Sequence, residues 1–256
     1  MNPSLHDLVA GLEHSARPTS ELAGNPQAIP HGKGVYAIWS DPAGWRDLVA
    51  GYETVRAAGA LPAAVTSTPV PGLCDGPIYL GKAERSLRAR AWRSHFGERS
   101  THQSTLRRTL AALLGASRGW TYAPRRGPDA DGQPPRISAH NFRLDATADG
   151  QLRQWMLEHL RLGWCEIADV ADLRAAEADL ISALRPPLNL THAKGPMRDA
   201  ARAARALIAD ALMGGDMPSA ARTAASFAEG PQPGLPTPRE TWAWPEPPPA
   251  ESSSVA

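Results

Sequence analysis

The chain has 256 residues, 42% of them hydrophobic, 21% charged and 6% aromatic. This is enough for one core of ordinary size with appendages. No segment approaches the roughly 18 apolar residues of a membrane span, and the start lacks a basic region followed by an apolar one. Two cysteines, Cys74 and Cys165, are too few for a disulfide framework or a structural zinc site. We therefore expect a soluble cytoplasmic protein with no membrane partner.

Positive charge is concentrated in one segment. The chain carries 27 basic and 26 acidic residues, but residues 82–126 hold eleven basic residues against two acidic ones. Such a segment either contacts a polyanion or forms a solvated arginine-rich face, and the charge alone leaves both interpretations open.

The first third of the chain predicts two strands separated by an insertion. Residues 1–30 contain a short helix, with Leu8 and Leu12 at helical spacing, and then a loop. The segments 34–39 and 77–82 are short and rich in β-formers, between glycines and prolines, as is typical of strands. Between them, the insertion 41–76 predicts a helix over 45–58 and a proline-rich loop over 62–76.

The middle of the chain alternates helices with short strands. In chain order we expect helices over 86–95 and 104–114, a loop over 124–135 and a strand with Phe142 and Leu144 on one face. Then come a helix over 151–162, a strand over 164–167 and a helix over 171–184, which Pro186 prevents from continuing. This order predicts an α/β domain over 31–195, with a small antiparallel or mixed three-stranded sheet flanked by helices. It differs from a βαβ dinucleotide-binding fold.

The C-terminal part has two compositions. Residues 196–228 are alanine-rich and predict two accessory helices, broken at Gly214 and Gly215. Residues 229–256 contain eight prolines and a terminal serine-rich stretch, which predicts a disordered tail.

A carboxylate occupies an unusual position on the helix predicted over 171–184. At about 3.6 residues per turn, Leu173, Leu180, Ile181 and Leu184 form one apolar stripe, and Glu177 falls inside it. Because burying an unpaired charge is unfavourable, Glu177 requires a metal ion, an arginine or a cleft open to water. A purely structural ion pair, or a side chain that simply reaches solvent, would explain the position equally well.

Several short motifs occur together in a particular order. They are Gly34-Val-Tyr36, Tyr79-Leu-Gly81 followed by Lys82, Leu87-Arg-Ala-Arg90, Glu177, and Pro187-Leu-Asn189. In this order they resemble the GIY-YIG nuclease family over essentially the whole central domain. The resemblance implies a metal-dependent endonuclease that hydrolyses phosphodiester bonds in DNA. A scaffold that binds nucleic acid without cleaving it, and an interaction protein acting through the alanine-rich helices and the tail, are the alternatives.

The resemblance assigns a role to each motif residue. Glu177 would hold one Mg²⁺ or Mn²⁺, and Arg90 would donate to the scissile phosphate. Tyr36 and Tyr79 would orient or deprotonate the attacking water. Lys82 would lower a tyrosine pKa, although an ordinary exposed lysine is equally consistent with its position. The amide of Asn189 would tie the segment after the helix to the site.

His95 is the site candidate whose placement conflicts with regular helix geometry. Many family members have a histidine or tyrosine one turn after the arginine, but His95 follows Arg90 by five residues, about 140° around an α-helix. It would share a cleft with Arg90 only if the helix ended or bent before Gly97.

DNA contacts are expected from the basic segment, because its arginines flank the predicted site. The candidates are Arg88, Arg93, Arg107, Arg108, Arg125 and Arg126. Since one site cuts one strand, a homodimer is one arrangement that would produce a double-strand break. His159 and Cys165 are interpreted as packing or surface residues.

Overall fold

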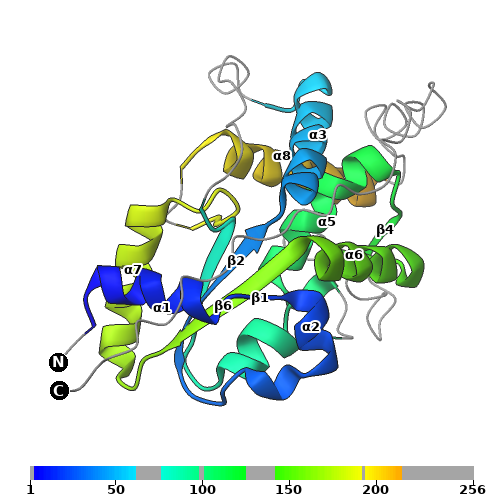
Figure 1. Ribbon diagram of the computed structural model, residues 1–256. Coiled ribbons are helices and arrows are strands. Elements are labelled where there is room, and N and C mark those ends of the chain that lie inside the picture. The colour runs from blue at the N-terminus through cyan, green and yellow to red at the C-terminus, as the bar shows by residue number, and fades with distance from the viewer. Residues whose placement is uncertain (1–2, 62–75, 98–100, 125–141, 192–193, 215–256) are drawn as a thin grey trace, which may run out of the picture.

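The computed structural model describes residues 3–61, 76–97, 101–124, 142–191 and 194–214 (Figure 1). Five expectations lie wholly or almost wholly outside these residues: the proline-rich loop over 62–76, the loop over 124–135, the contacts by Arg125 and Arg126, the second alanine-rich helix and the proline-rich tail.

The centre of the fold is an antiparallel sheet in the order β1-β6-β2-β3. Its three long strands are β6 (Leu160–Glu166), β2 (Gly34–Ser40) and β3 (Tyr79–Ala83). They confirm the predicted three-stranded sheet, to which the two-residue β1 (Arg17–Pro18) adds a fourth strand at the edge of β6. A separate pair is formed by β4 (Tyr122–Pro124) and β5 (Phe142–Leu144).

One face of the sheet is covered by two helices. α1 (Leu5–Ser15) and α7 (Val170–Leu184) pack against alternate sheet residues, among them Val35, Ala37 and Leu80. α1 begins at Ser4, whose side chain forms a capping box with Asp7. Figure 1 shows these two helices together on one side of the sheet.

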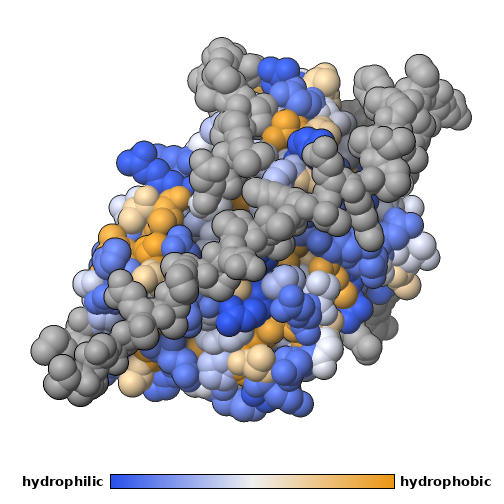
Figure 2. Space-filling view, in the orientation of Figure 1, coloured by the Kyte–Doolittle hydropathy of each residue, from blue (hydrophilic) through white to orange (hydrophobic). Residues whose placement is uncertain are grey.

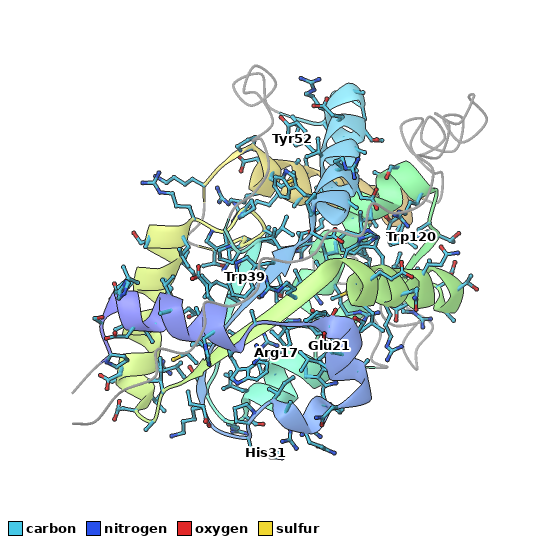
Figure 3. The ribbon with its side chains drawn as sticks, viewed as in Figure 1. Arg17, Glu21, His31, Trp39, Tyr52 and Trp120 are labelled. Atoms are coloured by element: carbon cyan, nitrogen blue, oxygen red, sulfur yellow. The ribbon has the colours of Figure 1, made fainter. Side chains whose placement is uncertain are left out.

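The opposite face carries most of the core. It is covered by α2 (Thr19–Gly24), α3 (Pro42–Ala57), α5 (Thr105–Arg118), α6 (Ala146–His159) and α8 (Pro196–Gly214), with short 3-10 segments η1 (Pro26–Ala28) and η3 (Thr101–Gln103). The helix of the insertion is integral to this core, because a β-carbon at Gly51 of α3 would lie 2.3 Å from the Leu113 carbonyl oxygen of α5. Tyr52 and Trp120 belong to this core, whereas Trp39 packs on the first face (Figure 3).

Caps explain where the structure departs from the predicted helix bounds. α3 and α6 begin earlier than the periodicity indicates, because Asp41 and Asp145 accept hydrogen bonds from the backbone N–H groups of Gly44 and Ala148. α6 ends at His159 and the chain continues directly into β6, four residues before the predicted strand.

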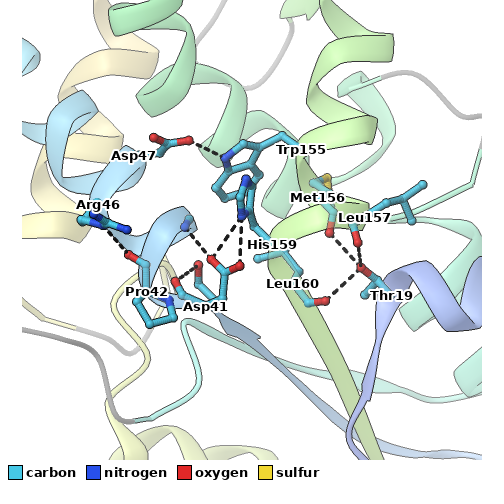
Figure 4. Close-up of polar contacts among 12 residues, drawn as sticks. Thr19, Asp41, Pro42, Arg46, Asp47, Trp155, Met156, Leu157, His159 and Leu160 are labelled. Atoms are coloured by element: carbon cyan, nitrogen blue, oxygen red, sulfur yellow. Dashed lines mark hydrogen bonds and ion pairs between the residues drawn. The ribbon is translucent and has the colours of Figure 1, made fainter. Parts of the chain in front are cut away.

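A polar cluster holds the junction between α6 and β6 (Figure 4). His159 Nδ1 donates to the Asp41 carboxylate at 3.1 Å, and Trp155 Nε1 donates to Asp47 at 2.8 Å. Thr19 Oγ1 donates to the Met156 carbonyl at 2.8 Å. These bonds connect the ends of α3, α6 and α2.

Hydrophilic residues predominate on the face shown in Figure 2, and hydrophobic ones form small separate areas. In the described part of the chain, no helix combines the length and the apolar character that crossing a membrane requires.

Candidate active site

A cavity of about 610 Å³ opens where β2, β3, α7 and the helix after β3 meet. That helix is η2 (Arg88–Arg93). Six of the predicted site residues line the cavity: Tyr36, Tyr79, Lys82, Arg90, Arg93 and Glu177. Residues separated by up to 141 positions therefore meet in one place.

The two tyrosines lie on the same face of adjacent strands. The rings of Tyr36 and Tyr79 have centroids 6.4 Å apart. Tyr36 pairs in register with Gly81, and a β-carbon at position 81 would lie 2.5 Å from the Tyr36 hydroxyl oxygen. Glycine at this position is thus what allows the phenol of Tyr36 to lie across β3.

Lys82 and Glu177 form an ion pair at the cavity wall. Lys82 pairs in register with Val35, which places it on the face covered by α7. Its ammonium donates to Glu177 Oε2 at 2.5 Å, and the two side chains are 29% and 22% exposed. Glu177, the carboxylate within the apolar stripe of α7, therefore reaches a water-accessible cavity next to the ammonium group of Lys82.

The helix geometry at η2 resolves the spacing between Arg90 and His95. The Ser94 N–H donates to the Ala89 carbonyl and the Gly97 N–H to the Trp92 carbonyl, both i to i+5 contacts. In a π-helix five residues complete about one turn. η2 ends at Arg93, so the helix does end before Gly97 as the spacing required; Arg90 faces the cavity and His95, in the turn that follows, lies close behind Tyr36.

His95 is fully buried between two hydroxyl groups. Its Nε2 lies 2.7 Å from the Tyr36 hydroxyl oxygen and its Nδ1 lies 2.6 Å from Ser104 Oγ. Burial, together with the positive charges of Arg90 and Arg107, lowers the pKa of His95 to about 3. The imidazole is therefore neutral at physiological pH.

The two phenols are neutral as well. Burial raises the pKa of Tyr36 well above its usual value, and the neighbouring Tyr79 acts in the same direction. Burial also raises the pKa of Tyr79, with the charge of Arg90 opposing the shift. In this state both hydroxyl groups can donate hydrogen bonds.

Asn189 attaches the segment after α7 to the edge of the sheet. Its Oδ1 accepts from the Leu80 N–H at 2.8 Å, and its Nδ2 donates to the Leu80 carbonyl at 2.9 Å. The side chain thus pairs with β3 as another strand would, and holds the site through backbone contacts.

The arginines predicted to contact DNA have different environments. Arg93 is exposed at the cavity. Arg88 bonds to Gln27 and to the Ile29 carbonyl. Arg107 is 1% exposed and paired with Asp149 at 2.9 Å, so its guanidinium has no access to a phosphate. The expectation that Arg107 contacts DNA is therefore wrong, because its guanidinium forms an interior ion pair with Asp149.

Arg108, the next residue of α5, is neither fully buried like Arg107 nor exposed like Arg93. It is half-buried, and one guanidinium nitrogen lies 3.3 Å from Thr105 Oγ1.

Sequence reasoning missed two residues of the site region. Gly81 belongs to one of the sequence motifs, but the motif does not reveal the contact that requires glycine there, and Ser104 belongs to none of the motifs. Ser104 does cap α5, since it accepts from the Arg107 N–H, but it also contacts His95. No local pattern reveals that second contact, because it joins two separate helices.

The fold and the cavity define an α/β protein with a carboxylate, an arginine, a lysine and two tyrosines gathered at the edge of an antiparallel sheet. The family model described as the GIY-YIG catalytic domain matches residues 34–207, which is more than half of the chain. The chain therefore belongs to the GIY-YIG family, whose members are typically endonucleases and generally use divalent metals. No curated protein and no solved structure matched.

Proposed function

We propose that this protein is a metal-dependent endonuclease that hydrolyses phosphodiester bonds in DNA. The observation that carries the proposal is the convergence of Glu177, Lys82, Arg90 and two neutral tyrosines on one open cavity. Phosphodiester hydrolysis requires mainly positioning and charge stabilisation, and these side chains supply both.

Glu177 fits a Mg²⁺ or Mn²⁺ ion that keeps most of its water shell. Within the described residues, no three His, Cys, Asp or Glu side chains gather as a metal cage. Mg²⁺ commonly binds through one or two carboxylates plus water and phosphate, and the cavity beside Glu177 has room for such a shell. When bound, the ion would supply Lewis-acid stabilisation of the phosphoryl oxygens and the leaving group.

The remaining residues act on the substrate and the attacking water. The exposed guanidinium of Arg90 would donate to the scissile phosphate. Because burial keeps Tyr36 and Tyr79 protonated, they would orient the water or the phosphate by donating hydrogen bonds. Lys82, which contacts Glu177, would hold the carboxylate in place and add positive charge at the phosphate.

The DNA would approach along the exposed side of η2. Arg93 and Arg85 line the same cavity as Arg90 and are exposed, so they would contact the flanking phosphates. Contacts from Arg125 and Arg126 stay predictions, as do the homodimer and the cytoplasmic location.

The test is nicking of supercoiled plasmid by the full chain, with Mg²⁺, Mn²⁺ or EDTA. We expect metal-dependent cleavage that falls at least about 100-fold in Glu177→Ala and in Arg90→Ala. Matched controls are Glu158→Ala and Arg56→Ala, exposed residues of α6 and α3 away from the cavity. Both controls should cleave as the unchanged protein does.

Two results would contradict the proposal. One is metal-dependent cleavage that survives both cavity substitutions. The other is that plasmid, branched DNA and RNA all stay uncleaved at every metal condition. Binding without cleavage would then favour a nucleic-acid-binding scaffold.

A further inference from the structure

A chain of buried polar groups extends from the cavity into the interior. It runs from the Tyr36 hydroxyl to His95 Nε2 at 2.7 Å, and from His95 Nδ1 to Ser104 Oγ at 2.6 Å. Ser104 Oγ in turn accepts from the Arg107 N–H at 3.0 Å. Tyr36, His95 and Ser104 are 0% exposed. Bulk water therefore does not compete for these bonds, and each hydrogen must find its acceptor within the protein.

The proton positions follow from counting donors and acceptors. A neutral imidazole has one N–H and one bare nitrogen. Ser104 Oγ uses one lone pair for the Arg107 N–H and has one hydrogen to donate. Among the described residues, His95 Nδ1 is the only acceptor within hydrogen-bond distance of that hydroxyl. Ser104 accordingly donates to Nδ1, which leaves the imidazole hydrogen on Nε2.

The opposite tautomer leaves a donor unsatisfied. If Nδ1 carried the hydrogen, Ser104 Oγ would accept from both Arg107 and His95, and its own buried hydrogen would have no acceptor among the described residues. A buried hydroxyl hydrogen without a partner is unfavourable. With the hydrogen on Nε2, Ser104 and His95 are both satisfied, and the one remaining hydrogen is that of the Tyr36 hydroxyl, which lies beside Tyr79 at the cavity.

The segment that carries Ser104 is held firmly. Arg107 donates through Nη1 to the His95 carbonyl at 3.1 Å, and its Nη2 lies 2.9 Å from Asp149 Oδ1. The same carboxylate oxygen accepts from the Thr101 N–H at 2.9 Å. α6 therefore fixes both ends of the turn around Ser104, so the hydroxyl cannot easily turn away from His95.

We infer that Ser104 is a positioning residue: it fixes His95 in the Nε2–H tautomer, so that His95 donates to the Tyr36 oxygen. The hydroxyl hydrogen of Tyr36 is then free for the neighbouring Tyr79 or for a ligand in the cavity. The tautomer assignment rests on the structure alone, whereas its effect on cleavage rests on the proposed function.

The direct test is nitrogen NMR of the full chain labelled with ¹⁵N-histidine, with the His95 signals assigned by backbone correlation. We expect Nε2 to show the shift of a protonated ring nitrogen and Nδ1 that of a bare one. A protonated Nδ1 in the unchanged protein would overturn the inference. This measurement requires no substitution and no activity.

Two substitutions of Ser104 separate the tautomer from folding. Ser104→Asp keeps a strong helix cap but offers only acceptors to Nδ1, so it should move the hydrogen from Nε2 to Nδ1. Ser104→Thr keeps both the cap and the hydroxyl and should leave the shifts unchanged. An Asp variant that folds with Nε2 still protonated would also overturn the inference.

Kinetics then test the link to cleavage. In Ser104→Asp, kcat should fall by about 10- to 100-fold, the range for losing the partner that orients a functional histidine. KM for DNA should not change, because the exposed arginines are untouched. A reversed tautomer with unchanged kcat would refute the positioning role. Absence of cleavage by the unchanged protein would refute the proposed function, and the NMR result would still decide the tautomer.

Discussion

Adding a single methyl group at Gly81 should displace Tyr36. In Gly81→Ala, the new β-carbon would lie 2.5 Å from the Tyr36 hydroxyl oxygen and 2.6 Å from its Cζ. The phenol has nowhere to move cheaply, since it is 0% exposed and bonded to His95 at 2.7 Å. Either the strands separate locally or the Tyr36–His95 bond breaks.

The magnitude follows from three effects. Overpacking a buried site typically costs about 1–3 kcal/mol, and losing the hydrogen bond costs about 1 kcal/mol. Replacing glycine by alanine also restricts the unfolded chain, which stabilises the folded protein by about 0.4–1 kcal/mol. We therefore expect Gly81→Ala to lower the free energy of unfolding by about 1–3 kcal/mol.

The assay is urea unfolding followed by tryptophan fluorescence, with plasmid cleavage measured in parallel. Gly150→Ala is the matched control, because Gly150 lies in α6 with nothing within 4 Å of the added β-carbon. That substitution should stabilise the protein by about 1 kcal/mol. If Gly81→Ala unfolds within about 0.5 kcal/mol of the unchanged protein, the argument from close contact is wrong.

Three further predictions concern polar contacts. Burial disfavours the charged imidazole of His159, but the carboxylates of Asp41, Asp47 and Glu158 together raise its pKa. His159→Gln should therefore reduce stability most below pH about 6.5, with the effect fading as pH rises through the raised value; urea unfolding at pH 6 and pH 9 checks this. Asn189→Ala should cost about 1–3 kcal/mol for each Leu80 backbone group left unpaired, measured by the same unfolding. Arg107→Met leaves Asp149 without its charge partner and should cost about 3–5 kcal/mol, read from the thermal midpoint and from unfolding.

Matched substitutions define what would contradict these three predictions. His14→Gln, on an exposed residue of α1, should be nearly neutral in unfolding. Asn25→Ala removes an exposed amide that makes no capping bond and should be nearly neutral. Arg118→Met breaks an exposed pair and should cost at most about 1 kcal/mol. Losses in the test variants no larger than in these controls would refute the reasoning.

Local patterns located the elements that carry the site. Short β-rich runs between glycines and prolines marked β2 and β3, and the apolar stripe of α7 marked Glu177 as a carboxylate that needed a partner. These signals are reliable because strand alternation and helix periodicity depend only on nearby residues.

The local sequence does not show which arginines are buried and which are exposed. Arg90 and Arg107 have the same charge and both lie in the basic segment, yet one is exposed at the cavity and the other is buried against Asp149. Asp149 is 42 residues further along the chain, so the pairing depends on how α6 packs against the start of α5, which carries Arg107. Charge patterning cannot distinguish these two outcomes.

By itself, the sequence determined the strand and helix order, the GIY-YIG motifs and the position of Glu177 on an apolar face, because these depend on composition and on spacing within one element. Only the tertiary structure decided that Lys82 pairs with Glu177, that the π-turn places His95 behind Tyr36, and that Ser104 completes that contact. Each of these joins elements distant in the chain, or depends on one inserted residue in a helical turn, and their geometry is fixed by packing.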